Sequence, residues 1–133
     1  MVEEGVIDVV CGVIRDAEGA YLACRRPAGK HLGGLWEFPG GKVDAGESPE
    51  AALARELHEE LAVHVEVGAA LEPVEWHYED VSIRLLPFVC VIPQGEPRAM
   101  EHEELCWVSV ADFGGLEWAP ADVPVLDCLR AGG

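Results

Sequence analysis

The chain has 133 residues, half of them hydrophobic, and its 25 acidic side chains outnumber 9 lysines and arginines to give a formal net charge of −16. A surface this acidic repels the phosphate backbone of DNA and RNA, which disfavours polymeric nucleic acid as a partner. No apolar run approaches the ~20 residues of a membrane-spanning helix, and the acidic start MVEEGVIDVV does not resemble a secretory signal. We therefore expect one domain over residues 1–133, located in the cytoplasm and away from membranes.

The first part of the chain predicts two strands and a loop. Residues 5–15 are β-branched and apolar and predict a buried strand. A turn over 16–19 leads to a second strand over 20–26, which we expect to form a hairpin with the first. A glycine-containing loop over 27–34 and a short apolar segment over 35–38 follow. The five cysteines are odd in number and form no CxxC pair, which predicts free thiols in a reducing compartment.

The middle of the chain predicts one long helix after a glycine-rich loop. Ser48 followed by Pro49 is typical of a helix start, since the hydroxyl can cap the helix and proline at the first helical position needs no N–H. Leu53, Leu57 and Leu61 repeat at i, i+4 and i+8, which predicts a buried stripe.

Carboxylates gather to one side of that stripe. At about 100° per residue, Glu56, Glu59 and Glu60 project together. Glu56 and Glu60 are like charges at i, i+4, and Arg55 can pair with Glu59 but cannot neutralise all three. One interpretation is a solvated acidic face. The other is a site for Mg²⁺, which prefers carboxylate oxygens and retains waters that phosphates can replace.

The second half of the chain predicts further strands. Residues 64–76 and 81–92 read as strands joined by a turn over 77–80, and Gly68 and Pro73 are expected to interrupt the first of them.

The chain then predicts a short strand and ends in a helix. Residues 104–108 predict the strand, 109–112 a helical turn, and 120–129 a closing helix. The side chains expected to face inward from that helix are Val123, Val125, Leu126 and Leu129. Strands flanking one long helix, with a second helix at the end, predict an α/β sandwich.

Several polar residues outside the long helix have two interpretations each. Arg25 and Arg26 alternate along a strand, so at most one of them is expected to reach a given site. His31 is either a surface histidine or a ligand contact. Glu101 belongs to either a charged loop or a metal site that it joins from outside the helix. Asp122 is either a favourable charge at a helix N-terminus or an acceptor facing a bound base.

The long helix and the loop before it resemble the Nudix box. The matching positions are Gly41, Glu47, Arg55-Glu56-Leu57, Glu59-Glu60 and Val63. Ala62 departs from the pattern, because the family usually has glycine there, and this puts the turn at the helix end in doubt.

Three further segments extend the resemblance to the MutT branch of the family, closest to bacterial CTP/oxidised-dNTP pyrophosphohydrolases. They are Leu35 to Lys42 (LWEFPGGK), Glu101 ahead of Trp107, and Ala119 to Pro124 (APADVP).

The resemblance implies an α/β/α sandwich around a mixed sheet, with one long catalytic helix and a C-terminal helix. It implies hydrolysis of normal or oxidised (deoxy)nucleoside triphosphates, of the 8-oxo-dGTP or CTP/dCTP type, to the monophosphate and pyrophosphate. Mg²⁺ is the implied cofactor, with Mn²⁺ able to substitute, and the implied partner is a small nucleotide bound to a monomer or homodimer. One alternative is a Nudix enzyme for nucleotide sugars, ADP-ribose or dinucleoside polyphosphates. The other is a non-catalytic nucleotide-binding module.

The resemblance also assigns residues. The implied metal ligands are the Gly40 carbonyl, Glu56, Glu59, Glu60 and Glu101. The implied substrate-binding residues are Arg26, His31, Glu37, Phe38, Pro39, Gly40 and Asp122. We expect Glu56, Glu59 or Glu101 to accept the proton as water attacks phosphorus in line. Arg55 is expected to act with them by orienting the glutamates.

Overall fold

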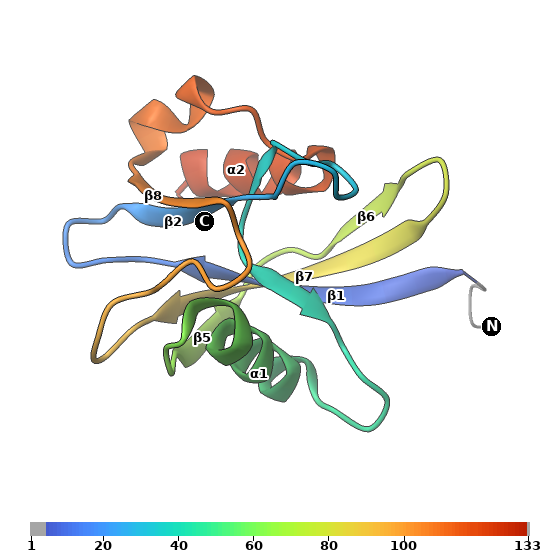
Figure 1. Ribbon diagram of the computed structural model, residues 1–133, viewed down its shortest axis with the longest axis horizontal. Coiled ribbons are helices and arrows are strands. Elements are labelled where there is room, and N and C mark those ends of the chain that lie inside the picture. The colour runs from blue at the N-terminus through green and yellow to red at the C-terminus, as the bar shows by residue number, and fades with distance from the viewer. Residues whose placement is uncertain (1–4, 133) are drawn as a thin grey trace.

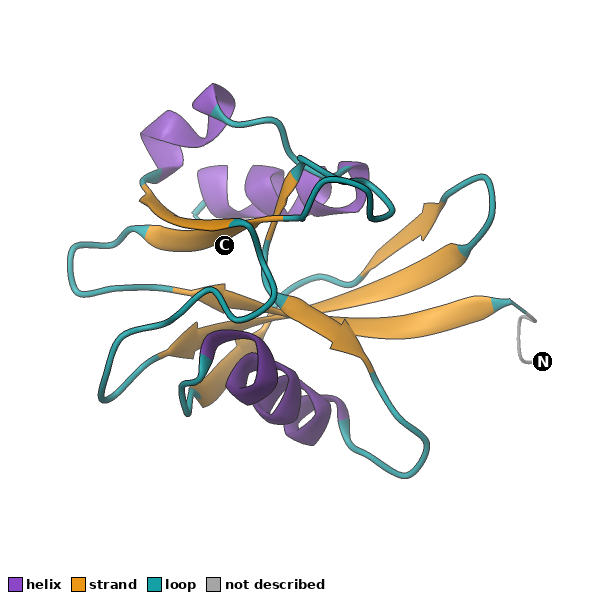
Figure 2. Ribbon diagram, viewed as in Figure 1, coloured by secondary structure: helices purple, strands orange, loops and turns teal. Residues whose placement is uncertain are grey.

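The computed structural model describes residues 5–132, in which two sheets lie between helices (Figures 1 and 2). The strands are β1 Val6–Ile14, β2 Tyr21–Arg25, β3 Trp36–Glu37, β4 Gly40–Lys42, β5 Glu66–Ala70, β6 Val74–His77, β7 Ser82–Val91 and β8 Glu104–Val108. The helices are α1 Pro49–Leu61, the 3₁₀ helices η1 Val110–Gly115 and η2 Pro120–Asp122, and α2 Val123–Arg130. In the view of Figure 1, α1 lies on one side of the strands and α2 on the other, which confirms the predicted α/β sandwich.

The larger sheet is mixed. Its order is β4-β1-β7-β5, with β6 also paired to β7, and the central β1 and β7 run parallel from Val6↔Ser82 to Ile14↔Cys90. Its other pairings are antiparallel. The smaller sheet, β3-β2-β8, is antiparallel throughout.

The predicted hairpin between the first two strands is wrong. The turn forms, because the Asp16 side chain accepts hydrogen bonds from the backbone N–H groups of Glu18 and Ala20. Only an isolated bridge, Arg15↔Tyr21, joins the strands before they enter different sheets. Strand β1 uses one edge for β4 and the other for β7, so β2 finds its partners in β3 and β8 instead.

Two other segments differ from prediction in part. Residues 40–42, expected in a loop, form β4, which pairs with β1 across Val10↔Gly41. The predicted strand over 64–76 is interrupted as expected, and forms two short strands that both pair with β7.

The closing helix is confirmed, but the predicted inward orientation of one side chain is wrong. Val125, Leu126 and Leu129 are buried, but Val123 is 40% exposed. Val123 lies two residues, or about 200°, before Val125, so it points away from the buried stripe.

Helix α1 forms as its sequence predicts. The Ser48 hydroxyl accepts a hydrogen bond from the Ala51 N–H at 3.1 Å. Leu53, Leu57 and Leu61 are fully buried against the larger sheet, each contributing about 1.5–3 kcal/mol by burial. The sheet lets the helix approach closely at Gly12, where a side-chain carbon would lie 2.8 Å from Leu57 Cδ1. The leucines therefore fix the height and rotation of α1 over the sheet.

The turn after α1 contains the one departure from the box. Ala62 has φ 57° and ψ 36°, the left-handed conformation that glycine adopts at lower cost, and its N–H bonds to the His58 carbonyl. The chain therefore makes the family turn with alanine.

Three other expectations concern the chain as a whole. All five cysteines lie in the described part and are free thiols, as predicted. Across residues 5–132 there is no helix with the length and apolar character to traverse a bilayer. The N-terminal segment used to argue against a secretory signal lies partly outside the described residues.

Candidate functional site

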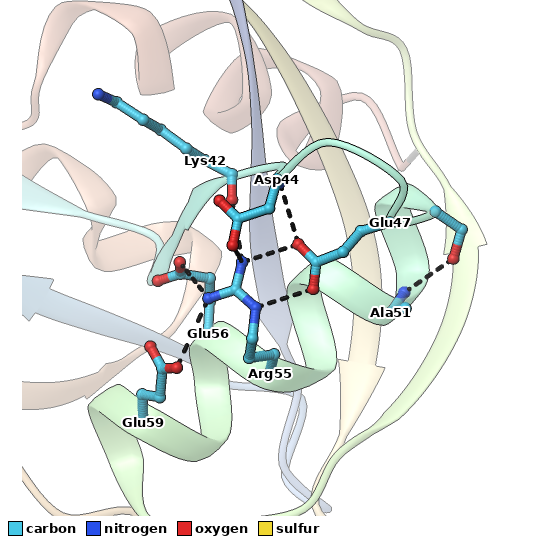
Figure 3. A network of polar contacts seen from close by, with 8 residues as sticks. Lys42, Asp44, Glu47, Ala51, Arg55, Glu56 and Glu59 are labelled. Atoms are coloured by element: carbon cyan, nitrogen blue, oxygen red, sulfur yellow. Dashed lines mark hydrogen bonds and ion pairs between the residues drawn. The ribbon is translucent and has the colours of Figure 1, made fainter.

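One arginine organises the acidic side of α1. Figure 3 shows Arg55 among four carboxylates, at 2.8 Å from Glu47, 2.9 Å from Glu56, 3.3 Å from Asp44 and 3.6 Å from Glu59. The predicted pairing with Glu59 is present, but it is the longest of the four. Two of these partners, Asp44 and Glu47, lie in the loop before the helix. Hydrogen bonding to Arg55 lowers the pKa of Glu47 to about 2.

Glu60 differs from its neighbours because it is buried, with 8% exposure. Burial first, and then a hydrogen bond with Glu56 and the charges of Glu37 and Glu101, together raise the pKa of Glu60 to about 9. Its Oε1 atom is one of two buried side-chain polar atoms in the described chain with no hydrogen-bond partner; the other is Nδ1 of His102. The helix therefore holds an acid that lacks a positive partner.

A cavity of about 330 Å³ lies beside Glu60. It is lined by Arg26, Pro27, Lys30, Glu37, Gly40, Glu60, Glu101 and His102. It brings together residues of both predicted sets: Gly40, Glu60 and Glu101 from the metal set, and Arg26 and Glu37 from the substrate set. Two cations and three carboxylates around one cavity suit a polyanion bound together with a cation.

A second cavity of about 240 Å³ shares Arg26, Glu37 and Gly40 with the first. Its remaining lining is Val9, Val10, Cys11, His31, Leu32, Phe38, Gly41, Lys42, Tyr78, Val81, Ile83, Leu85, Ala119, Ala121 and Asp122. A mostly apolar wall with a few polar groups is typical of a pocket for a flat organic group.

Asp122 is the buried acid of this second cavity. Its Oδ2 accepts a 2.7 Å hydrogen bond from the Phe38 N–H, and burial raises its pKa well above the ordinary value. Asp122 also stands at the N-cap of α2, as the helix-terminus interpretation expected, but its side chain makes no capping hydrogen bond there.

Arg25 ends β2 and Arg26 follows it, and their side chains point in different directions, as predicted. Arg26 Nη1 lies 3.1 Å from Glu37 Oε1, and its Nε donates to the His31 carbonyl at 2.7 Å. Arg25 instead lies near Glu103 and Glu104, at 3.8 and 3.9 Å. Only Arg26 lines the two cavities.

Four predicted site residues, Pro39, Arg55, Glu56 and Glu59, do not line either cavity. Pro39 is fully buried, and its carbonyl accepts a hydrogen bond from Gly12. Glu56 and Glu59 remain with Arg55 outside both linings.

Sequence reasoning missed Lys30, Tyr78 and His102 as lining residues. Tyr78 packs edge-on against His31 with ring centroids 5.5 Å apart, and its hydroxyl accepts a hydrogen bond from the Ala121 N–H. Each of the three belongs to a segment without a periodic pattern, so only its loop location and residue type were visible in the sequence.

The oxygen-rich residues around Glu60 fit a hard divalent cation. Within residues 5–132, no group of three or more His, Cys, Asp or Glu side chains is already gathered closely enough to hold a metal. The donor chemistry nevertheless suits one, because Glu56 and Glu60 crowd like charges and the buried Glu60 Oε1 has no partner.

The fold and site define an α/β/α protein with an acidic helix next to a charged cavity of about 330 Å³. Residues 6–127 match the NUDIX domain family. CTP pyrophosphohydrolase of Escherichia coli K12 is 40% identical over 129 residues, covering 95% of this chain and 93% of the relative. The 8-oxo-dGTP diphosphatase of the same organism is 32% identical over 124 residues, covering 93% and 96%.

Solved structures agree with these sequence matches. The solution structure of the E. coli ORF135 protein has a TM-score of 0.81 at 37% identity, covering 95% of this chain and 89% of that one. The MutT crystal structure from Methanosarcina mazei Go1 has a TM-score of 0.82 at 28% identity, covering 95% and 93%. The chain belongs to the Nudix family of hydrolases, which confirms the resemblance and the fold that it implied.

Proposed function

We propose that this Nudix hydrolase cleaves nucleoside triphosphates, normal or oxidised, to the monophosphate and pyrophosphate, with Mg²⁺ as cofactor. The observation that carries the proposal is the adjacency of the two cavities, which share Arg26, Glu37 and Gly40. The charged cavity suits a phosphate chain and the apolar one suits a base. Relatives named for CTP and for 8-oxo-dGTP support the same substrate class.

The residues that would hold the divalent cation are the Gly40 carbonyl and the carboxylates of Glu56, Glu59, Glu60 and Glu101. When bound, Mg²⁺ or Mn²⁺ neutralises phosphate charge and makes water a better nucleophile. The raised pKa of Glu60 supports the assignment, because a buried acid among other acids needs a cation in order to ionise.

The chain's own residues supply positioning and proton transfer. Arg26 and Lys30 attract the phosphates to the charged cavity. Water attacks phosphorus in line at the α–β bridge and the P–O bond to the bridging oxygen breaks, which releases the monophosphate and pyrophosphate. Glu56, Glu59 or Glu101 takes the proton from the water. Arg55 orients Glu56 and Glu59 through their ion pairs.

Base recognition is assigned to the second cavity. Phe38 and His31 border the base, and Asp122 reads its hydrogen-bonding edge. Because the pKa of Asp122 is raised by burial, its carboxyl group can be neutral and can donate as well as accept. Such a group pairs with a base edge that presents a donor beside an acceptor.

The test is a kinetic panel. We expect kcat/KM, measured with Mg²⁺ on normal and oxidised ribo- and deoxynucleoside triphosphates, to identify at least one triphosphate that yields pyrophosphate and the monophosphate. Release of a sugar phosphate, ribose phosphate or ATP from other nucleoside diphosphate derivatives, without turnover of any triphosphate, would contradict the proposal.

A further inference from the structure

A loop outside the Nudix box is attached to the end of the acidic helix. The N–H groups of Arg98 and Met100 donate to the carbonyls of Leu61 and Glu60, at 2.8 and 3.1 Å. On its other side, the Glu103 N–H donates to a carbonyl of β2 at 3.0 Å. The bonds from Arg98 and Met100 satisfy carbonyls in the last turn of α1, which have no partner within the helix. The segment between them is therefore held on both sides.

His102 lies in this held segment and bridges the two halves of the site. Its side chain is 6% exposed, and its Nε2 atom is 2.9 Å from Glu37 Oε2. Its Nδ1 atom is 4.0 Å from Glu60 Oε1. Glu37 belongs to β3 and pairs with Arg26, whereas Glu60 belongs to α1. The imidazole thus connects the substrate side of the charged cavity to the metal side.

The hydrogen-bond pattern assigns the His102 ring one tautomer. The Glu37 carboxylate, paired with Arg26, acts as an acceptor, so Nε2 of His102 carries the hydrogen that lies between them. In the neutral ring Nδ1 is then an acceptor, and it faces Glu60 Oε1. These are the two unpartnered buried atoms noted above, and they face each other.

We propose that His102 is a positioning residue that holds Glu37 and Glu60 in the orientations required by the nucleotide phosphates and the metal. The inference rests on the proposed function only in assigning those ligands to the two carboxylates. A rigid planar ring between the half-buried Glu37 and the buried Glu60 sets their separation, in the way that residues contacting metal ligands orient them. A smaller side chain would leave Glu37 held by Arg26 alone and would leave the Glu60 carboxylate free to rotate.

Three variants of His102 separate its two contacts. His102→Ala removes both. His102→Gln keeps a donor that can reach Glu37, and His102→Asn keeps a polar group facing Glu60. His64→Ala is the matched control, because His64 is exposed and stacks only on His58, with centroids 4.6 Å apart.

The first measurement is Mn²⁺ affinity by titration without nucleotide. We expect His102→Ala and His102→Gln to weaken it about tenfold, and His102→Asn and the control to leave it near the wild-type value. The second measurement determines KM and kcat separately on the triphosphate that the wild-type protein hydrolyses best. His102→Ala and His102→Asn should raise KM, whereas His102→Gln should lower kcat at nearly unchanged KM.

Folded His102→Ala with wild-type Mn²⁺ affinity would overturn the inference. Equal losses in the Gln and Asn variants would also overturn it, because that pattern is what a merely structural residue produces. The Mn²⁺ titration needs no nucleotide, so it decides the Glu60 contact even if the wild-type protein hydrolyses no triphosphate and the proposed function fails.

Discussion

The Glu56 carboxylate lies directly against the backbone of Gly41, in the space that a side-chain carbon on residue 41 would occupy. Strand β4 and helix α1 thus meet at a glycine and a glutamate that both belong to the Nudix box. A side chain on residue 41 would have to displace this carboxylate.

Gly41→Ala should therefore displace Glu56 and lower kcat by about 10²-fold, the usual cost of a misplacement near 1 Å. Thermal unfolding should change little, since the far end of a flexible side chain can move. Gly114→Ala is the control, because nothing lies within 4 Å of the added carbon there. Equal activity in the two variants would show that the contact has no catalytic importance.

Arg55→Lys should also lower turnover, by about 10- to 100-fold. A lysine cannot reach Asp44, Glu47, Glu56 and Glu59 together, because its ammonium lacks the planar fork of the guanidinium. Steady-state kinetics would measure the change. Arg130→Lys, which alters only an exposed pair with Asp127 and a contact with Phe113, should leave kcat unchanged.

Glu60→Gln should stabilise the metal-free protein while removing activity. The folded-state pKa of Glu60 is about 9 and the unfolded value is about 4.3, so the folded state binds more protons between these values. Wild-type stability without metal should therefore fall as pH rises from about 4.3 to 9. At pH 8 we expect the variant to gain about 1–2 kcal/mol in free energy of unfolding by urea titration. A variant with the wild-type pH dependence would contradict the assignment.

The same proton couples pH to metal binding. Divalent cations compete with it for the Glu60 carboxylate, so Mn²⁺ affinity should rise with pH up to about 9. Titrations at several pH values, compared with Glu60→Gln, would measure the slope and show whether it disappears.

Ala62→Gly should stabilise the protein by about 0.5–1 kcal/mol, because Ala62 adopts a left-handed conformation that costs alanine more than glycine. Ala62 is exposed and touches no catalytic group, so kcat should be unchanged. Chemical denaturation of both proteins would measure the difference. A lower midpoint for the glycine variant would indicate that loss of chain stiffness in the unfolded state outweighs the relief.

Asp122→Asn should alter base preference. The replacement keeps an acceptor for the Phe38 N–H but fixes one donor, so the ratio of kcat/KM between cytosine and oxidised guanine triphosphates should change by about tenfold or more. Mn²⁺ affinity should not change, because Asp122 lies outside the charged cavity. An unaltered ratio would show that Asp122 takes no part in base recognition.

Helix α1 could be predicted almost completely, whereas the sheets could not. A serine cap, a proline and a leucine every fourth residue are local signals, and they specify where a helix begins and which face it buries. The partner of β2 depends on which edges other strands leave free. That is a long-range property, and for this reason the expected hairpin was wrong.

The same division holds for the site. Helical periodicity in the sequence placed Glu56, Glu59 and Glu60 on one side of α1, and the box motif named the family. Tertiary structure decided that the Glu60 side chain is 11% exposed while the Glu59 side chain is 52% exposed. Burial depends on what covers each residue, and the cover for Glu60 is a loop with His102, which follows the helix by some forty positions. The sequence therefore determined which acids stand together, and only the fold decided which of them is buried away from solvent.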